Sequence, residues 1–404
     1  MSALTGLALR SLWNRRSTVV LTVFAVAVSV AMLLGVQKFR TAAQDSFAST
    51  ISGTDLVVGA RSGPLNLLLY AVFRIGDPTA NVSWKTFRMV SSHRDVAWTI
   101  PLSMGDSHRG YRVVGTTDAY FAHYRYAQGR GLTFVDGRAF GAGNEVVLGS
   151  EVARRLGYAI GDSIVISHGI GEVSFKSHDA NPGVVAGILE ATGTPVDRTI
   201  HVPLEMIDNM HGLEHADQSA GRSLSAFLVG MKSRESVLMM QRALNEYREE
   251  PLQAVIPGVA LAQLWSIVGV ADRALMLIAA CVALAGLLGM MASILTSLNE
   301  RRREMAILRS VGAQPRHVFG LLLLESALLT VAGVFLGVLL VYAILWVLRP
   351  WIAAHFGIHV PIAGLTRTDA TLLTAVVAAA VLMSAYPAWR AYRNSLADGL
   401  TIRL

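Results

Sequence analysis

The chain carries few residue patterns that could perform chemistry by themselves. The motifs GxxxxGK[ST], GxSxG, HExxH and CxxC are absent from the 404 residues, so the sequence has no P-loop of its own with which to bind and hydrolyse ATP. The best metal-ligand candidates are His211 and His215, whose i, i+4 spacing would let them share an ion on one helix. Gly212 weakens such a helix, and scattered surface histidines are the alternative interpretation. We therefore expect no catalytic centre and no bound cofactor in this chain.

The most specific segment is cationic and runs from Asn299 to Gly312. Its spacing predicts a short amphipathic helix with an apolar strip beside a positive face, and Gly312 followed by Pro315 would end it. Two interpretations remain open. The arginines alone are typical of a topology signal on lipid headgroups, whereas an apolar strip between cations and acids also suits a helix that docks into a partner. The strip consists of Met305, Leu308 and Val311, and the acids are Glu300 and Glu304.

Four long uncharged stretches must position this segment, one near the start and three near the end. Each has the ~20 apolar residues needed to cross a ~30 Å hydrocarbon layer, and runs without alternation cross as helices. The spans are predicted at Ser17–Gln37, Ala274–Asn299, Val318–Leu348 and Ala370–Trp389.

The distribution of arginines predicts the orientation of the spans. The chain has 35 basic and 28 acidic residues and a formal charge of +7. The basic excess lies in short segments beside the spans, and such segments remain in the cytoplasm. We therefore expect both termini and the 300–317 loop inside, with the large domain and the Arg349–Asp369 loop outside. This placement also argues against nucleic acid as a partner.

Within the spans, three residues stand out. Glu325 is costly in lipid and is expected to face protein or water, or to pair near the cytoplasmic end. Gly333 and Gly337 form a small-xxx-small pattern, which suits either a dimer interface or packing within one chain. The single cysteine, Cys281, lies in the second span, so the outer domain has no disulfide.

The outer domain is predicted to be α+β, with a β-rich insert. Strands are expected at Asp95–Leu102 and Arg109–Gly115, with the turn between them at Gly105-Asp106. A strand at Leu224–Met231, a helix at Arg234–Glu249 and an extended Leu252–Ile256 form a βαβ-type unit. Further strands are predicted at Asp55–Ala60, Glu145–Leu148, Ser163–Ser167, Val184–Leu189 and Thr199–Val202, and helices at Pro64–Ile75 and Ser83–Arg94.

These elements predict a segmented organisation. Helix-compatible stalks are expected on either side of the outer domain. The predicted segments are 1–16 (cytoplasmic N-terminus), 17–52 (first span and stalk), 53–257 (outer domain, with 53–119 and 221–257 around a β-rich insert at 120–220), 258–299 (stalk and second span), 300–317 (coupling helix), 318–348 (third span), 349–369 (outer loop), 370–389 (fourth span) and 390–404 (cytoplasmic tail).

Three stretches resemble the FtsX/MacB-like permease family, the type VII ABC systems that include MacB and LolC/LolE. Asn299–Gly312 (NERRREMAILRSVG) resembles the family's E-R-x-x-E-I-(G)-x-L-(R/K)-A-x-G loop. Val318–Gly337 resembles its third span, and Tyr386–Leu400 resembles its P-A-x-x-A-x-x-x-x-P-x-x-A-L ending, with Ser395 in place of proline. The one-plus-three topology also matches.

The resemblance implies a bacterial inner-membrane permease subunit that is not itself an enzyme. Its outer domain would be porter-like with a Sabre-like insert. It implies a cytoplasmic ABC ATPase dimer as partner, to which ATP and Mg would bind, since no ATPase segment precedes the first span. It also implies a second permease copy or paralogue, a periplasmic adaptor or substrate-binding protein, and contact with membrane lipid. The residues implied to couple to the ATPase are Glu300, Arg301, Arg302, Glu304, Met305, Leu308, Arg309 and Gly312.

Two functions follow as expectations. The first is mechanotransmission, in which cytoplasmic ATP hydrolysis drives the export or extraction of a periplasmic substrate such as a lipoprotein, lipid or peptide. The alternative is an FtsX-like signalling subunit that activates a periplasmic enzyme and transports nothing. The large outer domain favours export, because the outer domains of FtsX-type subunits are much smaller.

Overall fold

A computed structural model describes residues 16–141, 143–168, 182–210, 222–300, 314–356 and 364–394. The chain divides into two compact units. The helical unit comprises Met1–Ala42, Gly269–His355 and Val360–Leu404, and the α/β unit comprises Ala43–Val268 with Phe356–His359. Each is described by itself.

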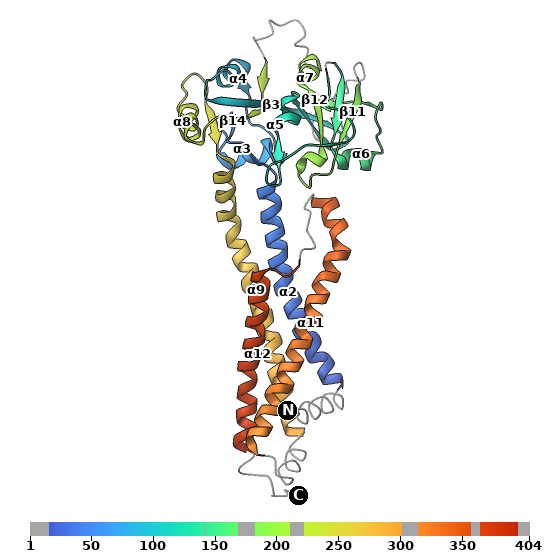
Figure 1. Ribbon diagram of the computed structural model, residues 1–404, viewed down its shortest axis with the longest axis vertical. Coiled ribbons are helices and arrows are strands. Elements are labelled where there is room, and N and C mark those ends of the chain that lie inside the picture. Colours follow the sequence, from blue (N-terminus) through green and yellow to red (C-terminus); the bar gives the residue numbers. More distant parts are fainter. Residues whose placement is uncertain are drawn as a thin grey trace. The chain divides into compact units, whose positions relative to one another are not determined.

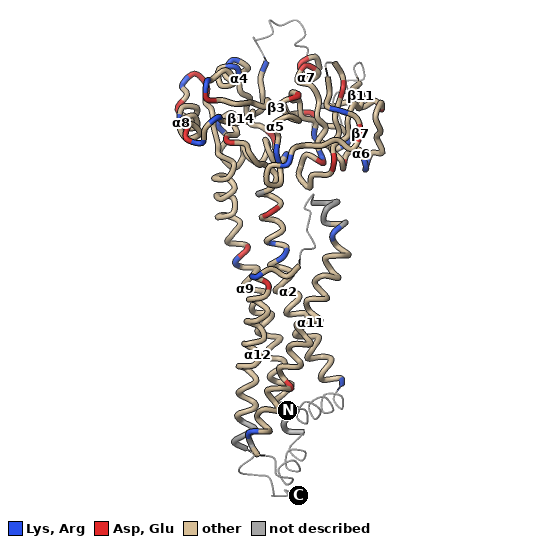
Figure 2. Tube along the Cα trace, in the orientation of Figure 1, with Lys and Arg blue, Asp and Glu red and all other residues tan. Residues whose placement is uncertain are grey.

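The described part of the helical unit is built from four long helices, α2 (Arg16–Ser49), α9 (Pro257–Glu300), α11 (Pro315–Phe356) and α12 (Arg367–Asn394), although the end of α2 after Ala42 and the beginning of α9 before Gly269 belong to the α/β unit. All four are long and apolar enough to cross a membrane, which confirms the four predicted spans. Figure 2 shows long stretches of these helices without a charged residue. Because a bilayer offers no hydrogen-bond partners, such segments keep their backbone bonds internal by remaining helical.

Two helix boundaries differ from the prediction. Helix α11 continues to Phe356, so the first part of the predicted Arg349–Asp369 loop is helical, and α12 begins at Arg367. The prediction ended the third span at the Arg349-Pro350 pair. A proline removes only one backbone donor, and long apolar helices continue past such positions when the other bonds are kept. Helices α2 and α9 also extend past their apolar stretches, to Ser49 and from Pro257, where the sequence predicted helical stalks.

The α/β unit is built on one long sheet with the strand order β15-β1-β14-β3-β4-β12-β8-β11-β7 (Figure 1). Strand β10 joins it through β3, and β9 joins it through β11. The strands are β1 (Leu56–Ala60), β3 (Val96–His108), β4 (Tyr111–Thr116), β7 (Phe134–Gly137), β8 (Glu145–Leu148), β9 (Ser163–Ile164), β10 (Ser167–His168), β11 (Gly183–Leu189), β12 (Thr199–Pro203), β14 (Ala226–Met231) and β15 (Leu252–Val255). Two short pairs lie apart, β2 (Val82–Ser83) with β13 (Ser223–Leu224) and β5 (Arg125–Tyr126) with β6 (Arg130–Gly131).

The predicted turn at Gly105-Asp106 is wrong. Strand β3 runs through these residues, and the pairing with β4 shifts register between Met104 and Ser107. A β-bulge accommodates an extra residue without ending the strand, and Gly105, at a φ of 151°, permits it. The chain reverses instead at Arg109-Gly110, where both residues have positive φ angles.

Strand β3 joins the two halves of the sheet. Its residues 96–102 pair with β14, and residues 103–108 pair with β4. The change of partner thus falls at Leu102/Ser103, earlier in the chain than the predicted start of the insert at 120. We call β15, β1, β14 and residues 96–102 of β3 the α+β half of the sheet, and residues 103–108 of β3 with β4, β12, β8, β11 and β7 the β-rich half.

The predicted βαβ-type unit has a third strand inside it. Strands β14 and β15 both pair antiparallel with β1, which lies between them. They therefore run parallel to each other, joined by α8 (Arg234–Asn245), whose first turn is capped by the Ser233 hydroxyl.

Three apolar cores follow from the alternation of side chains along the strands. One lies under α4 (Trp84–Ser91) and α8, and another under α6 (Ser150–Leu156) and α7 (Leu204–Met210). The third, which we call the stalk-side core, includes residues of both halves of the sheet, of α3 (Pro64–Ala71) and α5 (Ala119–His123), and of the adjacent ends of α2 and α9. Figure 1 shows α3 and α5 on the side of the sheet where the α/β-unit ends of α2 and α9 lie.

Candidate force-transmission sites

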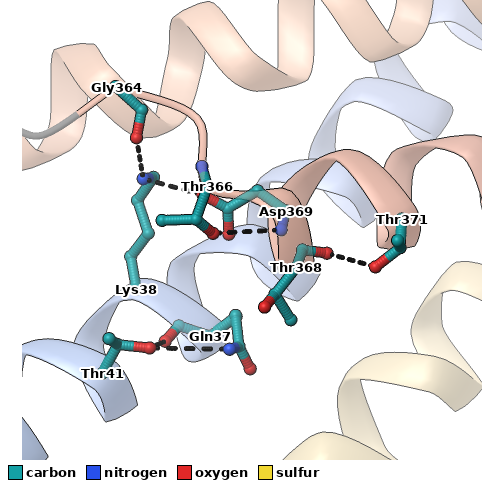
Figure 3. A network of polar contacts seen from close by, with 8 residues as sticks. All are labelled: Gln37, Lys38, Thr41, Gly364, Thr366, Thr368, Asp369 and Thr371. Carbon is teal, nitrogen blue, oxygen red and sulfur yellow. Dashed lines mark hydrogen bonds and ion pairs between the residues drawn. The ribbon is translucent and has the colours of Figure 1, made fainter.

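A buried ion pair connects α2 to α12 in the helical unit (Figure 3). Lys38 Nζ lies 3.1 Å from Asp369 Oδ2 and donates a hydrogen bond of 3.3 Å to the Gly364 carbonyl oxygen. The two side chains are 11% and 2% exposed. A charge removed from water in this way is tolerated only when it is paired and hydrogen-bonded, and here both conditions are met.

The first turn of α12 fixes the orientation of Asp369. The Thr366 backbone N–H donates to Asp369 Oδ2 at 2.9 Å, and the Asp369 N–H donates to the Thr366 hydroxyl at 3.2 Å. This reciprocal arrangement is a capping box, which satisfies helix N–H groups that have no intrahelical partner. The carboxylate is therefore oriented by its own helix as well as by Lys38.

Two further contacts connect α2 to the remaining helices. Lys38 Nζ lies 5.3 Å from the centre of the Tyr342 ring of α11, within the range of a cation–π interaction. Arg40 Nε lies 2.7 Å from Asp272 Oδ2 of α9, with side chains 40% and 17% exposed. Through two residues, α2 thus contacts each of the other three helices. We call Lys38, Arg40, Asp272, Tyr342 and Asp369 the collar.

Small residues bring α2 close to α9 and α11. A Cβ on Gly337 would lie 2.7 Å from the Ala27 carbonyl oxygen, and one on Gly333 would lie 2.7 Å from Val26 Cβ. On the α9 side, a Cβ on Gly286 would lie 2.3 Å from Ser29 Oγ. Gly333 and Gly337 therefore contact α2 of the same chain, which is packing within one chain.

Hydroxyl groups add directional contacts to this packing. The Ser29 hydroxyl donates to the Ala25 carbonyl oxygen of its own helix at 2.9 Å and also lies 3.2 Å from the Val282 carbonyl oxygen, and Thr22 Oγ1 lies 3.2 Å from Ser293 Oγ. Thr330 Oγ1 contacts Met290 Sδ at 3.4 Å. Glu325 of α11 is also buried, at 8% exposure. Side-chain hydrogen bonds of this kind fix the register of neighbouring helices in lipid.

In the α/β unit, the end of α2 is held by the segment that follows α5. The Tyr124 hydroxyl donates to the Thr50 carbonyl oxygen at 2.6 Å, and the Ala127 N–H donates to the Ser49 carbonyl oxygen at 2.8 Å. The Ser52 N–H donates to the Arg125 carbonyl oxygen at 2.9 Å. The last carbonyl groups of a helix have no intrahelical donors. The bond to Ser49 therefore caps the helix, and the other two extend the attachment into the residues that follow it.

The beginning of α9 is held differently, by chain continuity with the sheet. Strand β15 ends at Val255, and α9 begins two residues later, at Pro257. Strand β15 pairs with β1, the strand that follows α2, and Val57 lies opposite Val255. Phe47 of α2 packs edge-on against Trp265 of α9, with ring centres 5.8 Å apart. Both stalk helices thus enter the same end of one antiparallel strand pair.

Several of the residues singled out from the sequence lie outside the described ranges. Glu300 is the last residue of α9. The end of the predicted coupling segment 300–317 is described, because Pro315–His317 form the start of α11. The site residues of that segment after Glu300 lie outside the described residues, as do both candidate metal ligands. These are Arg301, Arg302, Glu304, Met305, Leu308, Arg309, Gly312, His211 and His215. Within the ranges that the structure describes, no cluster of His, Cys, Asp and Glu could hold a metal ion.

Reasoning from the sequence missed the collar. A signal was present, because Thr366-x-x-Asp369 before an apolar run is a capping-box pattern. Lys38 and Arg40 are the first charges after the first apolar run, and Asp272 is the last acid before the second. These positions predict similar depths in a membrane, but the sequence does not show which charge pairs with which.

The comparisons with known protein families are consistent with these two units. A family model described as the MacB-like periplasmic core domain matches residues 19–247, which is more than half of the chain. A second, the FtsX-like permease C-terminal domain, matches residues 276–396. The chain belongs to the FtsX/MacB-like permease family. The family resemblance seen in the cationic segment, the third span and the tail is thereby confirmed.

Among solved structures, the chain is similar to two extracytoplasmic domains. One is the extracellular domain of the ABC-type transporter YknZ from Gram-positive bacteria, with 15% identity, a TM-score of 0.32, and coverage of 50% of this chain and 98% of that domain. The other is the periplasmic region of MacB from Actinobacillus actinomycetemcomitans, with 11% identity, a TM-score of 0.35, and coverage of 53% and 94%. No curated protein matches the chain.

Membership of the FtsX/MacB-like family establishes the general role. The protein is a multi-pass permease subunit of the ABC-transporter type, with an extracytoplasmic core domain between its first and second spans. Members of this family are typically non-catalytic membrane subunits.

Proposed function

We propose that this FtsX/MacB-like subunit transmits the motion of a cytoplasmic ATPase to its extracytoplasmic α/β unit and thereby exports or extracts a periplasmic substrate. One observation supports this proposal above the others. Helix α2 is joined at the collar to every other helix of the bundle, and its end in the α/β unit is held by three hydrogen bonds. The part of α2 between the collar and Ser49 is thus a helix held at both of its ends, and such a rod can convey displacement, whereas a flexible linker cannot.

The motion would originate at the segment Asn299–Gly312. A separate ATPase dimer, which would bind the ATP and Mg, would hold this segment through Met305 and Leu308. Truncating buried anchors of this kind typically costs over ~1 kcal/mol each. Met305→Ala with Leu308→Ala should release the ATPase from purified membranes while the permease still inserts. If the segment were only a topology signal, this double variant would retain the ATPase.

The proposed orientation places both termini and this segment in the cytoplasm. It derives from the arginines beside the spans. A cysteine introduced at Ser310 should react with an impermeant thiol reagent only from the cytoplasmic side, and one at Ser219 only from outside. Both should be studied with Cys281 replaced by Ala. Labelling of both positions from one side would contradict the proposed orientation.

The stalk itself offers the sharpest test. A flexible Gly-Ser segment inserted near Ala262 of α9 should leave ATP hydrolysis largely intact. It should abolish the ATP-dependent change in amide exchange of residues 43–257, measured in the complex with its ATPase. As a control, the same seven helix-forming residues are inserted at the same level in both α2 and α9, which adds about two turns to each stalk and keeps the helix faces in phase, so it should preserve the response. An unimpaired response with the Gly-Ser insert would exclude transmission along α9.

The alternative function, activation of a periplasmic enzyme, would use the same motion. The partners that co-purify with the complex distinguish the two. A bound lipoprotein, lipid or peptide together with a periplasmic adaptor supports export, whereas a cell-wall hydrolase supports signalling.

A further inference from the structure

We propose that helix α5 and Tyr124 form the link by which displacement of α2 reaches the β-rich half of the α/β unit, with His201 of β12 as the receiving residue. This inference rests on the proposed mechanical function and deepens it, because it names the residues through which α2 would move the β-rich half of the sheet.

The first step is the attachment of Tyr124 to the end of α2. Its hydroxyl donates to the Thr50 carbonyl oxygen at 2.6 Å, and both residues are buried. The backbone bonds of Arg125 and Ala127 to Ser52 and Ser49 flank this contact on both sides. Breaking the Tyr124 bond would leave the buried Thr50 carbonyl oxygen unsatisfied, so the segment 124–127 should follow the end of α2.

The second step is a continuous set of packed rings. Tyr124 stacks on Tyr120 with ring centres 4.9 Å apart and planes 17° apart. The Tyr120 ring lies 4.8 Å from that of His201, and the Phe121 ring lies 5.8 Å from it. These residues are all buried. Close-packed interiors transmit displacement because no free volume is available to absorb it.

The third step is the position of His201 within the sheet. Strand β12 pairs parallel with β4 over five residues and antiparallel with β8. Ile200 and Val202 of β12 point into the core under α6 and α7, so alternation directs His201 to the opposite face, where Tyr120 and Phe121 contact it. A displacement of His201 would therefore move β12, which lies between β4 and β8 in the β-rich half.

The chemistry of His201 suits contact by packing rather than by charge. Burial, and secondarily the positive charge of Arg74, lower the pKa of His201 to about 3, so the ring is neutral at physiological pH. The Val147 backbone of β8 lies close enough to counter this lowering in part, but neither ring nitrogen makes a hydrogen bond of normal geometry within the described residues. The ring is consequently positioned by its aromatic neighbours, and it should move when they move.

The other stalk has a different target. Helix α9 continues directly from β15, which pairs with β1 in the α+β half. Helix α2 is likewise followed by β1, and among the described residues the hydrogen bonds to the segment that follows α5 come from the end of α2 and the residues just after it. A displacement of α2 relative to α9 would therefore move the β-rich half relative to the α+β half.

The test compares two tyrosine hydroxyls that make the same kind of bond. Tyr124→Phe removes the donor to the Thr50 carbonyl. The control, Tyr70→Phe, removes a buried hydroxyl that donates to the Ser225 carbonyl oxygen at 3.2 Å and makes no hydrogen bond with the end of α2 among the described residues. The readout is the ATP-induced change in amide exchange of β12 and β15, measured on the full chain in complex with its ATPase.

We expect Tyr124→Phe to reduce the ATP-induced change at β12 by about fivefold, the effect of losing one ordinary hydrogen bond, and to leave the change at β15 intact. Tyr70→Phe should leave the β12 response unchanged. His201→Phe keeps the ring contact and should preserve the response, whereas His201→Ala should remove it.

The outcomes separate this inference from the function on which it rests. If ATP changes the exchange of both strands and Tyr124→Phe leaves the β12 response intact, the link through α5 is wrong and the mechanical function stands. If ATP changes neither strand in the unmodified protein, the mechanical function is wrong and this inference is wrong with it.

Discussion

Helix α2 makes two ion pairs only two residues apart, and water reaches them to different extents. The Lys38 and Asp369 side chains are 11% and 2% exposed, whereas those of Arg40 and Asp272 are 40% and 17% exposed. The buried pair is enclosed by a capping box and a tyrosine ring, so the loss of either partner would leave a charge with no solvent to stabilise it. The exposed pair is screened, and water can replace either partner. Burial, rather than the number of ion pairs, should decide which connection of α2 is strong.

The largest expected effect comes from the buried pair. Lys38→Met leaves the Asp369 carboxylate without its counter-ion and should destabilise the folded protein by roughly 3–5 kcal/mol. The measurement is chemical denaturation of the purified full chain in mixed micelles. Adding Asp369→Asn removes the isolated charge and should recover part of the loss. If Lys38→Met and the double variant were equally stable, the charge would not be the cause.

A smaller effect is expected where α11 packs on α2. Gly337→Ala places a methyl group against the Ala27 carbonyl oxygen, and overpacking of this kind costs roughly 1–3 kcal/mol. Gly289→Ala is the matched control in α9, because no heavy atom lies within 4 Å of a Cβ at that position. The same denaturation experiment should find the control as stable as the parent protein or more so, since alanine favours helix. Equal stability of the two variants would contradict the close contact.

The third prediction concerns the pH dependence of stability. It compares the collar, whose charges are paired, with His201, which burial keeps neutral. The pKa of His201 is lowered from 6.5 to about 3, so the folded protein holds the ring neutral while the unfolded chain takes up a proton below pH 6.5. The contribution of His201 to stability is therefore complete above about pH 6.5 and decreases as pH falls towards 3. Between pH 7 and pH 5 the α/β unit should lose about 2 kcal/mol of stability through this residue.

The measurement is the difference in pH dependence between the parent protein and His201→Leu. Burial also lowers the pKa of His108, which therefore contributes to the slope of both proteins and cancels in the difference. The variant should show a shallower loss of stability between pH 7 and pH 5. Parallel curves would mean that His201 becomes protonated in the folded protein without penalty.

The smallest effect is expected at the exposed ion pair. Arg40→Met should change stability by roughly 0–1 kcal/mol, and the change should decrease further at high salt. It is the matched control for Lys38→Met, since both variants replace a long cation of α2 with the same residue. A loss as large as that of Lys38→Met would show that burial does not separate the two pairs.

Part of this organisation could be predicted from the sequence because it depends on short stretches of chain. The four spans follow from the length and composition of single segments, and the structure has all four. Most strands and helices of the α/β unit were also placed within a few residues, because turn residues and alternation are local signals. The motif around Asn299–Gly312 indicated the family, and the family models confirm it.

What the sequence could not show is which distant residues meet. Lys38 and Asp369 are separated by 331 positions, and any acid at a similar depth would satisfy the same pattern. The shared strand β3, with its bulge at Gly105, was predicted to end at Leu102, because a glycine within a strand and a glycine in a turn look alike without the partner strand. His201 looks like one of several scattered histidines until Tyr120 and Phe121 lie against it. Local composition determined the elements of this protein, whereas burial and pairing, which depend on the whole packed chain, decided which of its residues connect them.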